Sequence, residues 1–167
     1  MLEACAQNLE EAQKINPWLN TNFVELRKGD ALNLPVQDAS VDVAAQNCLF
    51  NIFKTEELKK ALQEMYRVLK PGGRLVMSDP ICEQEMNDEL RNNDHLRALC
   101  LSGSIPLKDY IKALTDVGFG TIEIRARRPY RILDTGNYPT TENIAVKNTP
   151  AKNFSKVDAG NKSSMIV

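Results

Sequence analysis

The chain has 167 residues, 43% of which are hydrophobic, and a formal net charge of -1 at pH 7. This length and composition suit one globular domain with a single apolar core. The near-zero charge offers no basic surface for a phosphate backbone, and no segment approaches the roughly 20 apolar residues of a membrane-spanning helix. The sequence therefore argues against nucleic acid and membrane as partners.

The N-terminal segment predicts a helix that is not a secretory signal. Apolar residues recur at helical spacing through Leu2, Cys5 and Leu9, and Pro17 is expected to end the helix. The segment is acidic, unlike the basic-then-apolar pattern of a signal peptide. We therefore expect a cytoplasmic protein with reduced thiols and with Cys5 in the core. The four cysteines lack the paired spacing of a zinc ribbon or a redox dithiol.

Three segments predict strands. Residues 22–28 alternate between apolar and polar side chains, as a half-buried strand does. Residues 41–46 form a short, almost continuous apolar run, which is typical of a strand buried on both faces. The RLVMSD sequence at 74–79 predicts a further buried strand.

Helical periodicity separates these strands. A helix is expected to begin at Thr55 and to end at the KPGG sequence of residues 70–73. A polar helix is expected over about 86–101, and another begins at Pro106 and ends at Gly118. The alternation of strands and helices predicts an α/β fold with a Rossmann-like, doubly wound, mostly parallel sheet.

We expect this domain to cover residues 1–148, with further strands at 121–128 and 142–148, and a polar, disordered tail over 149–167. Ligands of doubly wound sheets bind beyond the carboxyl ends of the strands. The residues that directly follow the predicted strands are therefore candidates for a site. These are Gly29 to Ala31, Asn47 with Cys48, and Asp79 to Cys82.

Several motifs resemble the class I S-adenosylmethionine-dependent methyltransferases. They are GDALNLP at 29–35, VDVAAQNCLFN at 41–51 and LQEMYRVLKPGGRLVMSD at 62–79. Within that superfamily the chain is most similar to arsenite methyltransferases, particularly the bacterial arsenosugar-biosynthesis branch, through QNCLFNIFK at 46–54 and LRALCLSGSIPLKDY at 96–110. The resemblance implies methyl transfer from S-adenosylmethionine to a small substrate, trivalent arsenic or its thiol adduct.

The resemblance also assigns roles to individual residues. It implies that Asp30 and the Ala31 backbone contact the adenine of the methyl donor, and that Asn47 faces the donor. Cys48 and Cys100 match the two cysteines that hold arsenic in the family. Trivalent arsenic is thiophilic, and two thiolates would hold it while its lone pair attacks the sulfonium methyl group. Such a transfer requires no general base.

Other interpretations of these residues stay open. Cysteine is among the most frequently buried residue types, so Cys48 and Cys100 can also be core residues, with Cys100 on the apolar face of its helix. Cys82 also follows a strand and is a candidate third thiol ligand. The Gly-Asp pair that contains Asp30 is ordinary turn chemistry.

The sequence has no GxGxG-like run and no counterpart of the family's first two strands. We therefore interpret Met1 as an internal position of a longer ancestor, and expect an N-terminally truncated sheet whose exposed edges favour self-association. Two alternatives to the arsenic function remain. One is a methyltransferase for another small molecule, and the other is a non-catalytic remnant that binds arsenic or a protein partner.

Overall fold

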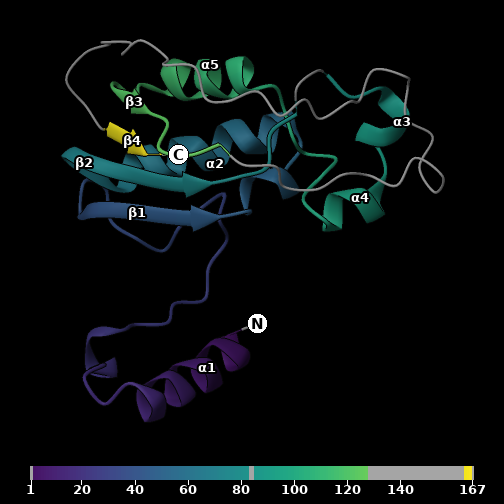
Figure 1. The fold of residues 1–167 in the computed structure, drawn as a ribbon. Coiled ribbons are helices and arrows are strands. Elements are labelled where there is room, and N and C mark those ends of the chain that lie inside the picture. The colour runs from purple at the N-terminus through teal and green to yellow at the C-terminus, as the bar shows by residue number, and fades with distance from the viewer. Residues whose placement is uncertain (1, 83–84, 128–163, 167) are drawn as a thin grey trace. The chain divides into compact units, whose positions relative to one another are not determined.

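The computed structural model of the protein describes residues 2–82, 85–127 and 164–166 (Figure 1). Length alone predicts one domain, whereas the chain divides into two compact units, Met1–Pro35 and Val36–Val167. No helix in the described ranges combines the length and the apolar character that crossing a membrane requires.

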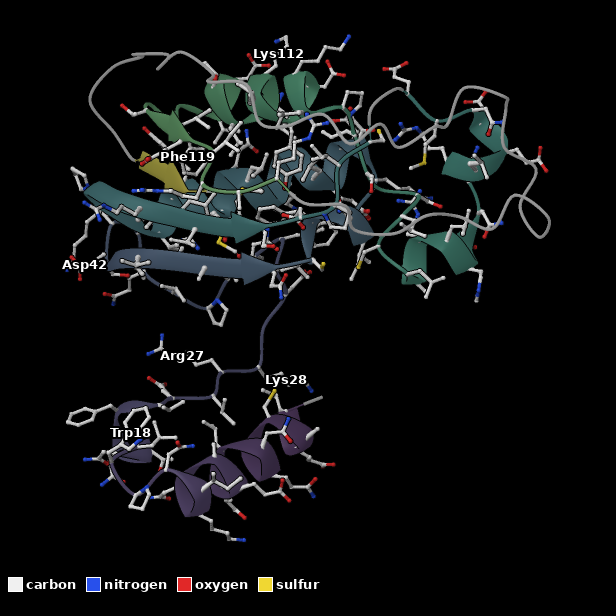
Figure 2. The ribbon with its side chains drawn as sticks, viewed as in Figure 1. Trp18, Arg27, Lys28, Asp42, Lys112 and Phe119 are labelled. Atoms are coloured by element: carbon white, nitrogen blue, oxygen red, sulfur yellow. The ribbon has the colours of Figure 1, made fainter. Side chains whose placement is uncertain are left out.

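The N-terminal unit contains α1 (Leu2–Ile15) and the 3-10 helix η1 (Thr21–Phe23). α1 ends before Pro17 as predicted, but it has no buried residue and Cys5 is exposed, so the expected core position of Cys5 is wrong. The strand predicted over 22–28 is also wrong, because residues 24–28 pair with no strand in the described part of the chain. A strand needs a neighbour for its backbone hydrogen bonds. The Phe23 side chain is 88% exposed, and Trp18 is also exposed (Figure 2).

The second unit is built on a parallel sheet (Figure 1). Its strands are β1 (Val41–Asn47), β2 (Leu69–Ser78), β3 (Ile122–Glu123) and β4 (Ser164–Ile166), in the spatial order β1-β2-β4-β3. All the pairings between these strands are parallel, which confirms the predicted α/β class with a parallel sheet. At the carboxyl ends, Gln46 pairs with Met77 and Asn47 with Ser78. The segments that follow β1 and β2 therefore start side by side.

Three strands differ from their predictions. β2 begins at Leu69 rather than at 74, so the KPGG sequence at 70–73 lies within the strand. β1 is not buried on both faces: its residues are half-buried or exposed, and Val43 is 54% exposed. The reason is that β2 is its one strand partner within the described residues, so β1 is an edge strand there. β3 is shorter than the strand predicted over 121–128. The strand predicted over 142–148 and most of the predicted tail lie outside the described residues, although Ser164–Ile166 form β4.

Two helices form the core with the sheet. α2 (Thr55–Val68) contacts both β2 and α5 (Leu107–Val117), and its buried face holds Leu58, Leu62 and Met65. The Glu57 carboxylate accepts the backbone N–H of Lys54 at 2.9 Å, which stabilises the start of α2.

α5 is bounded by the two residues that the sequence predicts. Pro106 is its N-cap, and Gly118, with φ 115°, is its left-handed C-cap. The Phe119 ring, labelled in Figure 2, then packs edge-to-face on Tyr66 of α2, with 5.4 Å between ring centroids. This contact fixes the end of α5 against α2.

The single helix predicted over 86–101 is wrong, because that segment forms two short helices. These are α3 (Asp88–Arg91) and α4 (Asp94–Ala98). The Asn87 side chain accepts the N–H of Leu90, and the Asn93 side chain accepts the N–H of Leu96. Asparagine competes with helical hydrogen bonds in this way, so Asn93 starts a new helix where the periodicity predicts continuation.

Candidate functional site

The chain turns sharply at Cys48, just beyond the end of β1. The backbone N–H of Cys48 donates to the Ser78 carbonyl at 2.8 Å, which continues the β1–β2 ladder by one bond. Cys48 itself has φ 57°, and the 3-10 helix η2 (Phe50–Ile52) follows. A non-glycine residue in this left-handed region costs about 1–3 kcal/mol and persists only where its surroundings impose it.

Cys100 follows α4 and has the same unusual backbone conformation, with φ 60°. Its Sγ donates a hydrogen bond to the Cys48 carbonyl oxygen at 3.2 Å. Both cysteines are half-buried, whereas Leu96 on α4 is 1% exposed, so neither is a fully buried core residue. The structure thus brings together the two cysteines that the resemblance pairs, although 52 positions separate them in the sequence.

Cys82, which follows β2, contacts the loop after Cys100. Its Sγ donates to the Ser104 carbonyl at 3.4 Å, and the Ser104 hydroxyl donates to the Cys100 carbonyl at 3.2 Å. Burial raises the pKa of the Cys82 thiol to about 11. Across the described residues, no three His, Cys, Asp or Glu side chains are grouped as a metal ion would require. Arsenic binding by Cys82 stays a prediction.

The two cysteine segments meet backbone to backbone at Gly103. A Cβ atom at Gly103 would lie 2.8 Å from the Asn51 Cα and closer still to the Asn51 carbonyl group. Asn51 is 1% exposed, and its Nδ2 donates to the Pro80 carbonyl at 2.8 Å. Only glycine fits at this approach, which holds the turn after Cys48 against the loop after Cys100.

A carboxylate that sequence reasoning left without a role lies behind the Cys48 turn. Asp79 directly follows β2, and its Oδ2 accepts a hydrogen bond from Gln46 Nε2 and another, at 3.0 Å, from the Tyr110 hydroxyl. Burial raises the pKa of Asp79, and the hydrogen bonds from Gln46 and Tyr110 oppose that rise only in part. Burial and the nearby Asp79 also raise the pKa of Tyr110. The position of Asp79 at a strand end makes it a candidate from the sequence, but periodicity does not indicate that Gln46 and Tyr110 bind it.

Replacing Asp79 by asparagine should change how stability depends on pH. The folded state holds the Asp79 proton more tightly than the unfolded state, whose carboxyl has the ordinary pKa of 3.8. The stabilisation from that proton is present below pH 3.8 and is lost as the pH rises through the raised folded pKa. Urea denaturation between about pH 4 and 8 should therefore show the wild type losing stability relative to Asp79→Asn. A difference that stays constant or grows with pH would contradict this.

The three residues predicted to contact the methyl donor are all on the surface or close to it. Asp30 is exposed in the N-terminal unit, where its Oδ1 accepts the N–H of Leu32 at 2.9 Å. This is the turn geometry that its Gly-Asp context suggests. Ala31 is half-buried in the same turn, and Asn47 is exposed at the end of β1. Their contacts with the donor stay predictions.

Known proteins resemble this chain over part of their length. The sequence model of the methyltransferase domain family matches residues 1–77. The arsenite methyltransferase of Aquipseudomonas alcaligenes is 33% identical over 118 residues, which are 71% of this chain and 34% of that protein. The demethylmenaquinone methyltransferase of Desulfitobacterium hafniense is 45% identical over 58 residues, 35% of this chain and 22% of that protein.

Among solved structures, an arsenic (III) S-adenosylmethionine methyltransferase from Chlamydomonas reinhardtii is 30% identical, with a TM-score of 0.49 over 57% of this chain and 33% of that chain. The chain therefore spans about a fifth to a third of the length of these relatives.

The chain resembles the class I S-adenosylmethionine-dependent methyltransferases, and its residues 1–77 match the sequence model of a methyltransferase domain. S-adenosylmethionine is the methyl donor of this class. Arsenite methyltransferases are among its relatives at 31–34% identity.

Proposed function

We propose that this chain supplies the arsenic-binding part of an arsenite methyltransferase, with Cys48 and Cys100 as the two thiolate ligands of trivalent arsenic. The observation that carries the proposal is the 3.2 Å hydrogen bond from Cys100 Sγ to the Cys48 carbonyl, at the ligand-bearing edge of a parallel sheet. The similarity to arsenite methyltransferases supports the choice of substrate.

The chemistry of binding follows from the two thiols. Each thiol replaces one hydroxide of arsenous acid and a water molecule leaves, so that two As–S bonds form with no change in oxidation state. Soft thiolate ligands suit this thiophilic centre better than oxygen ligands do. A half-buried pair is accessible to so small a solute, and arsenic remains exposed on the side away from the two sulfurs.

S-adenosylmethionine is the proposed methyl donor to the bound arsenic. The Asp30 carboxylate is expected to contact its adenine; Asp30 is exposed, and its Oδ1 accepts the Leu32 N–H. Calorimetry with S-adenosylmethionine tests this donor side of the proposal.

Arsenite titration of the cysteine variants tests the proposal. Cys48→Ser and Cys100→Ser should each weaken arsenite binding more than tenfold, which is about 1.4 kcal/mol, because one As–S bond is lost. The near-ultraviolet absorbance of the arsenic–thiolate bond reports the titration, with a phosphine as the reductant. Cys5→Ser, on the exposed face of α1, is the matched control and should bind as the wild type does. Undiminished binding by Cys48→Ser would rule out the assigned ligand.

A second candidate is methyl transfer to another small molecule, which the 45% identity to a demethylmenaquinone methyltransferase favours. In that case both cysteines are replaceable, and product analysis with candidate acceptors separates the two functions. The third interpretation is a non-catalytic remnant that binds arsenic or a protein partner. Calorimetry that detects arsenite binding but no S-adenosylmethionine binding would favour it.

A further inference from the structure

Gln46 links the carboxylate of Asp79 to the turn that carries Cys48. Its Nε2 donates to Asp79 Oδ2, and its Oε1 accepts the backbone N–H of Leu49 at 2.9 Å. A side-chain amide provides both a donor and an acceptor on one planar group. Both polar atoms of the Gln46 amide therefore form hydrogen bonds, one with Asp79 and the other with Leu49.

These bonds hold the backbone on both sides of Cys48. The N–H of Cys48 is bound to the Ser78 carbonyl at 2.8 Å, and the N–H of the next residue, Leu49, is bound to Gln46. Cys48 lies between them with φ 57°, a conformation that a cysteine does not favour by itself. The Gln46 amide thus supplies part of the surroundings that impose this conformation.

The acceptor that orients Gln46 is itself fixed. Tyr110 comes from α5, is 3% exposed, and donates its hydroxyl to the same Asp79 oxygen at 3.0 Å. A rigid, half-buried carboxylate rather than solvent therefore sets the direction of the Gln46 amide.

We propose that Gln46, anchored by Asp79 and Tyr110, is a positioning residue that holds Cys48 in the backbone conformation from which its thiol shares arsenic with Cys100. This inference rests on the proposed arsenic binding. It assigns no contact between Gln46 and arsenic, since Gln46 acts through the Cys48 turn.

Exchanging the donor and the acceptor of the Gln46–Asp79 hydrogen bond tests the inference. Gln46→Glu puts a second carboxylate against Asp79 and removes the donor, while it keeps an acceptor for Leu49. Arsenite affinity should fall about tenfold in the folded protein. In the double variant Gln46→Glu with Asp79→Asn, the asparagine amide donates to the new carboxylate, and the affinity should return to within about threefold of the wild type. Gln63→Glu makes the same chemical change on the exposed face of α2 and should have no effect.

The outcomes separate this inference from the function on which it rests. Circular dichroism and the alkylation rate of Cys82, which lies outside the Cys48 turn, should match the wild type in Gln46→Glu, because a general loosening of the fold would raise alkylation. Weak binding in Gln46→Glu with recovery in the double variant supports the positioning role. Wild-type affinity in Gln46→Glu, or no recovery in the double variant, overturns it even if Cys48→Ser binds weakly. Wild-type affinity in Cys48→Ser overturns the arsenic assignment itself.

Discussion

Replacing Phe50 by alanine should lower the free energy of unfolding of the second unit by about 3–5 kcal/mol. Phe50 is 0% exposed although it begins η2, two residues after the Cys48 turn. The loss combines the transfer free energy of the ring with the cavity that it leaves, since packed interiors relax only in part. Urea denaturation followed by circular dichroism measures it, with an unchanged dependence on urea concentration.

Ile52 provides the matched control on the same turn. Its side chain is 46% exposed, so Ile52→Ala should cost less than about 1 kcal/mol. Equal losses in the two variants would show that Phe50 does not anchor the turn in the core.

Gly103→Ala should cost about 3 kcal/mol of stability and should also weaken arsenite binding. The added methyl group meets the Asn51 backbone, and backbone cannot rotate away as a side chain end can. The loop after Cys100 must therefore separate from the turn after Cys48, which moves the two thiols apart. Thermal denaturation and arsenite titration measure the two effects on the same samples.

Gly72→Ala separates steric from conformational cost. Gly72 has φ 81°, but nothing lies within 4 Å of an added Cβ, so alanine there should cost only about 1 kcal/mol. Arsenite binding should be unchanged in this variant. If Gly103→Ala were as mild as Gly72→Ala, the close approach of the two cysteine segments would be wrong.

The sequence predicts best where the signal is local. The structure confirms the helical spacing of the apolar residues of α2. It also confirms Pro106 and Gly118 as the residues that start and end α5. Residues 41–46 predict β1, but not its exposure, because exposure depends on neighbouring strands that periodicity does not identify. Residues 22–28 alternate as a strand does, but periodicity does not identify a neighbouring strand, and within the described residues they form no strand.

The candidate site is less readable from the sequence because its contacts are nonlocal. Periodicity places Cys100 on one continuous helix. In the structure Asn93 starts a second helix, α4, and Cys100 lies after the end of α4 with φ 60°. The pairing of Cys48 with Cys100 came from the resemblance to arsenite methyltransferases, and the geometry brings the two residues together. Gln46 lies within two of the motifs, but neither assigns it a role, and its hydrogen bond to Asp79 exists because β2 ends beside β1.

Arsenic K-edge X-ray absorption of the arsenite-loaded protein, with a phosphine as the only reductant, tests the central claim most directly. The account predicts two sulfur ligands in the wild type and one fewer in Cys48→Ser and in Cys100→Ser. A shell of oxygen alone in the wild type, or a sulfur shell that neither substitution changes, would contradict it.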